Sequence, residues 1–236
     1  MKFETPLIRA TLIRRYKRFL ADVTLEDGRE VTAHVANPGS MMGMADTGAT
    51  VWLELNDDPK RKLNYSWKLI EIGDAMVGVD TGVANRVVKD ALQSGALNLG
   101  YSDFKPEVKY GTGSRVDFLL SDAQKPDLYL EVKSVTLSRT TGLAEFPDSK
   151  TERGTKHMNE LAGMVTHGYA ATVLFLVQRD DAVHVNVARD IDSKYATAFD
   201  CARAAGVRVI CFDCRIGVAE IVLGKQLPLA NARNSV

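Results

Sequence analysis

Two acidic side chains and a lysine occupy matched positions on either side of a short polar turn. Asp117 lies in the apolar run 114–120, while Glu131 and Lys133 lie in the apolar run 128–134. If the two runs pair symmetrically about the turn as an antiparallel hairpin, Asp117 falls directly opposite Glu131, with Cβ atoms about 5 Å apart. Because side chains alternate along a strand, Lys133 then shares the face of Glu131.

An opposed pair of carboxylates favours a bound divalent cation. Like charges directly opposite each other destabilise a sheet by about 0.2–1 kcal/mol, and a cation between them removes the repulsion. Mg²⁺ and Mn²⁺ prefer oxygen ligands, and a lysine beside them could orient water or neutralise a phosphate oxygen. Asp117, Glu131 and Lys133 are therefore candidate catalytic residues for phosphodiester cleavage, with Asp117 and Glu131 as metal ligands. The alternative is an ordinary solvated strand face with Asp117 nearby by chance.

Basic side chains gather at places where a phosphate backbone could bind. The net charge is zero, which argues against a highly basic nucleic-acid binder, yet local patches set the field that DNA meets. Residues 2–18 contain six basic side chains and one acid. Candidate DNA contacts are Arg14, Arg15, Lys17, Arg18, Arg115, Arg153 and Lys156. A second basic cluster consists of Lys60, Arg61, Lys62 and Lys68.

The first 80 residues alternate with the period of a β-strand and are divided by turn residues. We expect about five short strands, with Phe19, Ala21, Val23 and Leu25 on one apolar face. Tyr65 and Trp67 alternate in phase with neighbouring leucines, which favours the core over a base-stacking surface. Short strands without a long helix predict an OB-like barrel.

From Asp80 onward the pattern changes to alternating helices and strands. Helices are predicted over 83–92 with Thr81 as cap, from about Thr151 to Gly168, and over 193–205. The continuous apolar run 170–177 is typical of a central strand covered on both faces. The sequence therefore predicts a two-domain protein whose fold class is α+β or mixed α/β. Residues 1–80 are expected to form an OB-like β-barrel, and residues 81–236 an α/β domain.

Cysteine usage and hydropathy argue against a disulfide-stabilised, secreted or membrane protein. Cys211 and Cys214 have the spacing of a redox or zinc pair, but no second pair accompanies them, so we interpret them as buried or edge thiols. The chain has no apolar run of the roughly 18 residues that a membrane helix needs and no signal-peptide pattern. A cytoplasmic protein without membrane partners is expected.

The Asp117, Glu131-Val132-Lys133 constellation resembles the core of the PD-(D/E)xK nuclease superfamily. Longer stretches resemble the sugar fermentation stimulation protein A family, at residues 15–23, 37–41, 108–111, 114–118, 131–137 and 146–154. This resemblance implies an N-terminal OB-like domain, a nuclease-like C-terminal domain and sequence-non-specific DNA binding. It also implies a link to the regulation of sugar metabolism, notably that of maltose.

Two features bear on whether the chain would cut DNA. Active nucleases of this superfamily often carry a further acid on the first helix, where this chain has Asn85 and Arg86, with Asp90 one turn later. His157 follows the basic start of the second helix and is either a proton shuttle or an ordinary histidine. Three functions stay open: a regulatory DNA-binding protein, a Mg²⁺-dependent endonuclease or exonuclease, and a sugar- or nucleotide-sensing module. No organic cofactor is expected.

Overall fold

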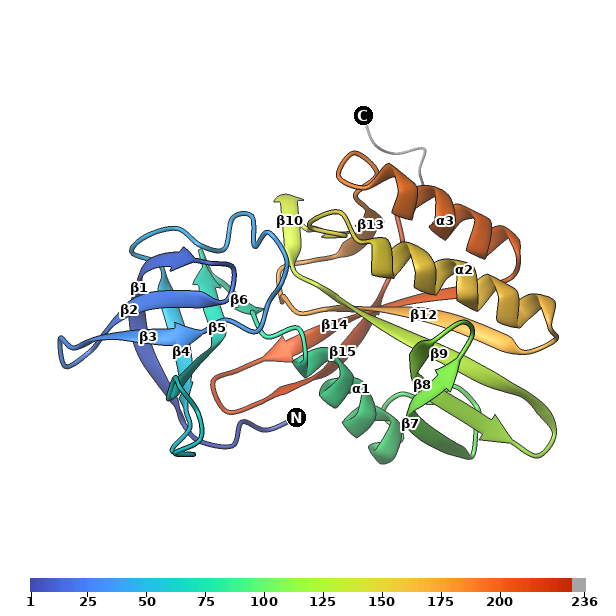
Figure 1. The fold of residues 1–236 in the computed structure, drawn as a ribbon, viewed down its shortest axis with the longest axis horizontal. Helices are drawn as coiled ribbons and strands as arrows, with labels where there is room; N and C mark the ends of the chain where they lie inside the picture. The colour runs from blue at the N-terminus through green and yellow to red at the C-terminus, as the bar shows by residue number, and fades with distance from the viewer. Residues whose placement is uncertain (231–236) are drawn as a thin grey trace.

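Alternating apolar residues close the N-terminal strands into a small barrel (Figure 1). In the computed structural model, which describes residues 1–230, β3 pairs with both β2 and β5, so that β1 to β5 form a closed sheet extended by β6. Trp67 lies fully buried at its centre and Tyr65 packs against the same core, as predicted. The predicted OB-like barrel is confirmed. Its strands are β1 (Leu7–Tyr16), β2 (Leu20–Leu25), β3 (Glu30–His34), β4 (Thr50–Leu55), β5 (Tyr65–Ile72) and β6 (Ala75–Gly78).

Phe19 departs from the predicted apolar face. Ala21, Val23 and Leu25 are buried as expected, but Phe19 lies in the turn between β1 and β2 and is 43% exposed. The two residues before it, Lys17 and Arg18, have φ angles of 46° and 64°. This left-handed turn interrupts the alternation of buried and exposed side chains. The alternation of β2 therefore begins after Phe19, and the prediction that Phe19 is buried is wrong.

A six-stranded sheet forms the centre of the second domain. The order is β15-β14-β12-β9-β8-β7, in which β9, β12 and β14 run parallel. A small sheet of β10, β11 and β13 lies beside it. The strands are β7 (Asp103–Tyr110), β8 (Ser114–Asp122), β9 (Lys125–Val135), β10 (Leu137–Thr140), β11 (Leu143–Phe146), β12 (Ala170–Val177), β13 (His184–Val187), β14 (Arg208–Ile216) and β15 (Ile221–Leu227).

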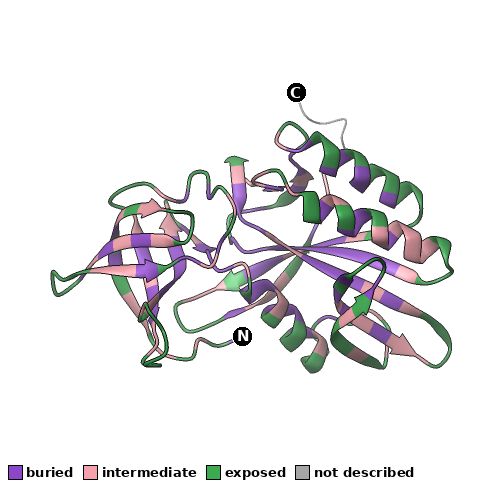
Figure 2. Cartoon of the chain, in the orientation of Figure 1, coloured by how far each residue is buried: buried purple, intermediate pink, exposed green. Residues whose placement is uncertain are grey.

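Helices cover both faces of this sheet (Figure 1). Leu174 and Leu176 of β12 pack toward α1 (Val83–Ser94), whereas Val173 and Phe175 pack toward α2 (Glu152–Thr166) and α3 (Ser193–Ala204). The middle of the sheet is buried on both sides (Figure 2). Double coverage explains why the sequence of β12 is continuously apolar, and this prediction is confirmed.

The helix boundaries follow local capping signals, with one exception. Helix α2 begins directly after Thr151, as predicted, and Thr151 caps it by accepting from the backbone N–H of Gly154 at 3.0 Å. The predicted cap of α1 is wrong, because that position is taken by Gly82 without a side-chain cap. Thr81 instead donates its hydroxyl to the carbonyl of Ala36 in the barrel, at 3.2 Å. Thr81 therefore forms a contact between the domains instead of the helix cap that the local sequence predicts.

Two further expectations concern the thiols and the membrane. Cys211 and Cys214 are buried free thiols on β14, as predicted, and Cys201 is an exposed free thiol. Burial raises the pKa of Cys211 to about 12, which keeps this thiol protonated and unreactive at neutral pH. Within residues 1–230, no helix has both the length and the apolarity needed to cross a membrane.

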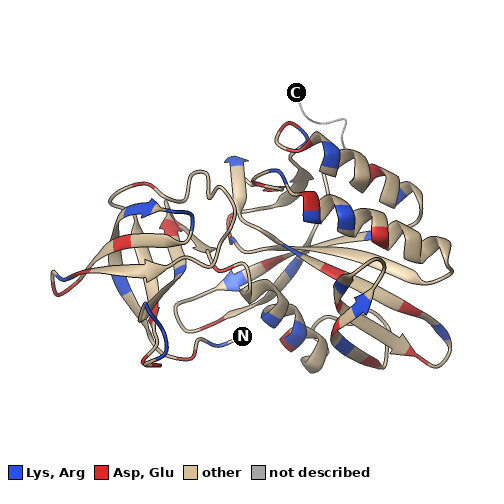
Figure 3. Ribbon diagram, viewed as in Figure 1, with Lys and Arg blue, Asp and Glu red and all other residues tan. Residues whose placement is uncertain are grey.

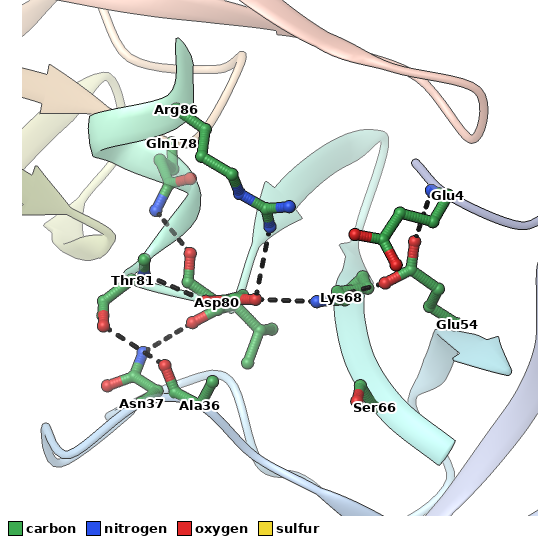
Figure 4. A network of polar contacts seen from close by, with 12 residues as sticks. Glu4, Ala36, Asn37, Glu54, Ser66, Lys68, Asp80, Thr81, Arg86 and Gln178 are labelled. Carbon is green, nitrogen blue, oxygen red and sulfur yellow. Dashed lines mark hydrogen bonds and ion pairs between the residues drawn. The ribbon is translucent and has the colours of Figure 1, made fainter. Parts of the chain in front are cut away.

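A buried lysine joins the barrel to the segment that leads into α1 (Figure 4). Lys68 of β5 contacts Asp80 at 2.7 Å and Glu54 at 3.3 Å. Gln178, at the end of β12, donates to the carbonyl of Asp80 at 3.3 Å and to the hydroxyl of Ser134 at 2.7 Å. The prediction that Lys68 belongs to the basic cluster with Lys60 and Lys62 is wrong. Its ammonium group is buried at the domain junction, where it pairs with two carboxylates.

Truncating this lysine is expected to destabilise the whole chain. Lys68→Ala leaves two carboxylates buried without their cation, and breaking a buried pair in this way costs about 3–5 kcal/mol. Urea titration should show that loss in the free energy of unfolding. Lys62→Ala, at an exposed position of the neighbouring loop, is the matched control and should change the value by less than about 0.5 kcal/mol. Equal effects of the two substitutions would contradict this role.

Candidate functional site

The hairpin of β8 and β9 has the predicted register. Backbone pairing joins Phe118 to Leu130, Leu119 to Tyr129 and Leu120 to Leu128. The recorded pairing ends there, one residue short of Asp117 and Glu131, and Asp117 instead accepts from the backbone N–H of Val132. Lys133 lies on the face of Glu131, as predicted, because its Nζ atom is 2.7 Å from Glu131 Oε1.

Asp117 is held by two donors within the protein. Asn85 of α1 donates its amide to Asp117 Oδ1 at 2.7 Å, and the backbone N–H of Val132 donates to Oδ2 at 2.7 Å. Burial, and then the negative charge of Glu131, raise the pKa of Asp117 to about 6. The sequence indicated Asn85 only as the place of a missing acid, so its contact with Asp117 was not foreseen. Asp90 lies elsewhere, 3.0 Å from the amino group of Met1.

Glu131 is almost completely buried, with an exposed fraction of 2%. Its Oε1 atom contacts both Lys133 and the Nδ1 atom of His157. Burial alone would raise the pKa of Glu131, but the charge of Lys133 and the contact with His157 outweigh it, so that the pKa is lowered. Glu131 Oε2 is also buried, and within residues 1–230 it has no hydrogen-bond partner.

The start of α2 contributes a histidine and an arginine to the site. His157 is 4% exposed and lies between Glu131 and Arg153, whose Nε atom is 3.3 Å from His157 Nε2. Lys156 does not share this position, because its Nζ atom donates to the carbonyl of Thr112 at 2.8 Å in the turn between β7 and β8. The structure therefore brings Arg153 and His157 together but not Lys156, although the sequence predicts both Arg153 and Lys156 as DNA contacts.

A cleft of about 790 Å³ opens above these residues, and both domains line it. The barrel supplies the loop 37–39 and Arg18, and the second domain supplies the acidic pair and the segment 145–153. The two walls touch where the hydroxyl of Ser40 donates to the carbonyl of Asp148 at 2.8 Å. Gly39 is required at this contact, since a Cβ there would lie 2.1 Å from a carboxylate oxygen of Asp148.

The predicted DNA contacts are only partly gathered at this cleft. Charges of both signs are distributed over both domains (Figure 3). Arg18 and Arg153 line the cleft. Arg15 instead donates to the carbonyls of the loop 37–40 at 3.0–3.1 Å, which makes its role there structural. The others do not line it: Arg14 pairs with Asp22 at 2.9 Å, Lys17 is exposed in the β1–β2 turn, Arg115 is exposed on β8, and Lys156 bonds to Thr112.

Comparison with known proteins agrees with this two-part architecture. The model of the SfsA N-terminal OB domain matches residues 13–79, and the model of the sugar fermentation stimulation protein RE domain matches residues 82–220. The chain belongs to the sugar fermentation stimulation protein family. The resemblance seen in its motifs, with an OB domain followed by a nuclease-like α/β domain, is confirmed.

Family members match over nearly the full chain. The sugar fermentation stimulation protein homolog of Ruegeria sp. (strain TM1040) is 56% identical, covering 97% of this chain and 100% of that protein. The homolog of Caulobacter vibrioides is 44% identical, covering 98% of each chain. A solved structure of Pyrococcus furiosus SfsA in complex with Ca²⁺ has the same fold, with a TM-score of 0.87 at 23% identity, covering 98% of this chain and 100% of that chain.

The raised pKa of Asp117 predicts a pH-dependent stability difference. Asp117 has an ordinary pKa of 3.8 when unfolded and about 6 when folded, so its ionised form destabilises the native state above about pH 6, and the cost vanishes below about pH 4. Two pKa units correspond to about 3 kcal/mol. Asp117→Asn should therefore be more stable than the unsubstituted protein at pH 8 by up to this amount, with the gain shrinking toward pH 4. Urea titrations across this range test it, and a pH-independent difference would contradict it.

Proposed function

We propose that this protein binds DNA in the cleft between its domains and holds a divalent cation against Asp117 and Glu131. The observation that carries the proposal is the buried oxygen Glu131 Oε2, which lacks a hydrogen-bond partner in the described chain beside a second carboxylate. A buried polar atom without a partner is costly, and a cation would satisfy it. The Ca²⁺ held by the Pyrococcus furiosus relative supports this assignment.

The donor set fits a hard cation that keeps part of its water shell. Within residues 1–230 no three His, Cys, Asp or Glu side chains are grouped to hold a metal ion. Mg²⁺ is commonly bound through one or two carboxylates, with water and phosphate as further ligands, so Asp117 and Glu131 suffice for Mg²⁺ or Mn²⁺. When bound, such a cation would polarise a phosphoryl oxygen or activate a water.

The chain's own residues supply the rest of a phosphate site. Lys133 is fixed by Glu131 at 2.7 Å and lines the cleft, so its charge is available to a phosphate oxygen there. Arg18, Lys150 and Arg153 also line the cleft. The first turn of α2 also lies at the cleft, and the N-terminus of a helix favours anions. Binding through phosphates is sequence-non-specific.

A second candidate function is DNA binding without cleavage. Both oxygens of Asp117 already accept hydrogen bonds, from Asn85 and from Val132. A cation must therefore compete with these donors, and Asn85 stands where active nucleases of the superfamily often have an acid. This arrangement favours a regulatory DNA-binding protein that retains a nuclease-like site.

A divalent cation should stabilise the fold through the two acids. A ligand at 100 times its dissociation constant raises the free energy of unfolding by about 2.7 kcal/mol. Thermal or urea unfolding with Ca²⁺, Mg²⁺ or Mn²⁺ should give a stabilisation that Asp117→Ala and Glu131→Gln abolish. Asp127→Asn, which changes an acid of the same hairpin outside the cleft, is the control and should keep it. Equal stabilisation of all variants would refute the cation site.

DNA binding and cleavage can be separated in one set of assays. Filter binding at several salt concentrations should give an affinity that falls with salt, with a slope of about −0.9 per phosphate contacted on duplex DNA. Absence of affinity even at low salt would rule out the proposal. Incubation of plasmid, linear duplex and single strands with Mg²⁺ or Mn²⁺ then tests cleavage. Cleavage lost in both Asp117→Ala and Lys133→Ala would establish a nuclease, whereas binding without cleavage supports the regulatory candidate.

The regulatory part of the proposal concerns sugar metabolism. Relatives over 50% identical carry the name sugar fermentation stimulation protein homolog. A regulator that senses a sugar through its barrel would bind DNA with an affinity that depends on that sugar. Adding maltose to the binding titration tests this directly, and an unchanged affinity would leave DNA binding in place without maltose as effector.

A further inference from the structure

We propose that His157 is a positioning residue, held by Arg153, that fixes the carboxylate of Glu131 so that its Oε2 atom is the oxygen left for a cation. This inference rests on the proposed function and deepens it, because it gives two side chains of α2 a role at the same site. It is carried by the contacts of both ring nitrogens of His157, by the burial of the ring and by the anchoring of the helix turn that carries it.

The contacts of the His157 ring determine which of its nitrogens carries the proton. The Nε atom of Arg153 lies 3.3 Å from His157 Nε2, and an arginine N–H donates but never accepts. His157 Nε2 must therefore accept, which places the ring proton on Nδ1. The Nδ1 atom contacts Glu131 Oε1, which is an acceptor. Both contacts thus agree on one arrangement, in which the arginine donates to the ring and the ring donates to the carboxylate.

This arrangement leaves no nitrogen of His157 free. Both nitrogens have protein partners, and the residue is only 4% exposed. The ring is therefore unable to bind a metal directly or to carry a proton to a substrate without losing one of these contacts. It connects two other residues that line the cleft, one of which is a candidate metal ligand. The geometry thus favours a positioning role over the proton shuttle that the sequence left open.

Two donors converge on one oxygen of Glu131. Lys133 Nζ donates to Oε1 at 2.7 Å, and the His157 ring contacts the same atom. The Oε2 atom is buried and has no hydrogen-bond partner in the part of the chain that the structure describes. A lysine side chain is flexible along its four-carbon stem, whereas an imidazole ring held at both nitrogens is rigid. The ring therefore restrains the carboxylate more tightly than the lysine does.

The helix turn that carries the pair is anchored on two sides. Arg153 and His157 are four residues apart, so they share one face of α2. Thr151 caps this turn through the backbone N–H of Gly154. Gly154 also packs closely against α3, since an added Cβ would lie 3.2 Å from Tyr195 Cδ2. The ring therefore reaches β9 from main chain that is itself fixed, as an outer partner of a metal ligand requires.

The charge of Arg153 separates this role from simple electrostatics. A guanidinium repels a nearby cation, so charge alone predicts that removing Arg153 strengthens cation binding. If Arg153 acts by fixing His157, its removal weakens cation binding instead. The two effects have opposite signs. Because Arg153 is exposed, its truncation also changes little in the packing of the fold.

Binding of Mn²⁺ to the full chain without DNA tests the arginine, with the free ion followed by electron paramagnetic resonance. Arg153→Ala should weaken Mn²⁺ affinity by about two-fold to ten-fold, the effect of one lost hydrogen bond. Lys156→Gln is the matched control. It removes the same charge from the same helix outside the cleft, keeps a donor for the carbonyl of Thr112, and should leave the affinity unchanged or tighter.

Two substitutions test the ring in the same assay. His157→Phe keeps an aromatic ring but loses the donor, and should weaken Mn²⁺ affinity by about 10-fold to 100-fold, the usual effect of removing a partner of a metal ligand. His157→Asn keeps a donor near the position of Nδ1 and should recover most of this loss. A ring that only filled space would give the reverse order, because Asn is the smaller side chain.

The proton on the ring can be located without any cation. Long-range ¹H–¹⁵N correlation spectra of the metal-free protein should place the His157 proton on Nδ1, and a proton on Nε2 would overturn the inference. Equal Mn²⁺ affinity of the unsubstituted protein, Arg153→Ala and His157→Phe, or tighter binding by Arg153→Ala, would also overturn it while leaving the cation site intact. No Mn²⁺ binding by the unsubstituted protein would instead overturn the proposed cation site itself.

Discussion

The buried ammonium group of Lys68 constrains how the two domains meet. A charge in the interior requires partners of opposite sign, and here they come from β4 (Glu54) and from the segment between the domains (Asp80). Asp80 also lies 3.8 Å from Arg86 of α1, whose neighbour Asn85 holds Asp117. One ion-pair network thus links the barrel, the segment between the domains and the helix that contacts Asp117.

The two acids differ in environment although both line the same cleft. Glu131 is stabilised as an anion by Lys133 and His157, while Asp117 has neutral donors and a pKa raised to about 6. Neutral donors compensate less for burial than charged ones. One carboxylate is therefore firmly ionised, and the other titrates close to neutrality. Protein contacts hold both side chains in place, which is the preorganisation that binding sites need.

Local patterns in the sequence predicted much of this arrangement, and long-range contacts decided the rest. The register of β8 against β9 followed from the symmetry of the two apolar runs about their turn, and the start of α2 near Thr151 from the pattern of its own first turn. The burial of Lys68 and the engagement of Asn85 depend on partners distant in sequence, so no local signal indicated them. Strand β7 was not predicted although Phe104, Val108 and Tyr110 alternate with charges, because Pro106 interrupts the run; proline is tolerated here since β7 is an edge strand.

The contact between Ser40 and Asp148 also bears on how the chain folds during synthesis. Pairing within the barrel joins consecutive strands except for β1 with β4 and β3 with β5, and all of these pairings lie within residues 7–78, so the N-terminal domain closes through contacts of its own. The hydroxyl of Ser40, by contrast, bonds to a residue 108 positions later. Since the N-terminal part leaves the ribosome first, the barrel can close early, but its loop must wait for the second domain. The cleft is therefore among the last parts of the molecule to form.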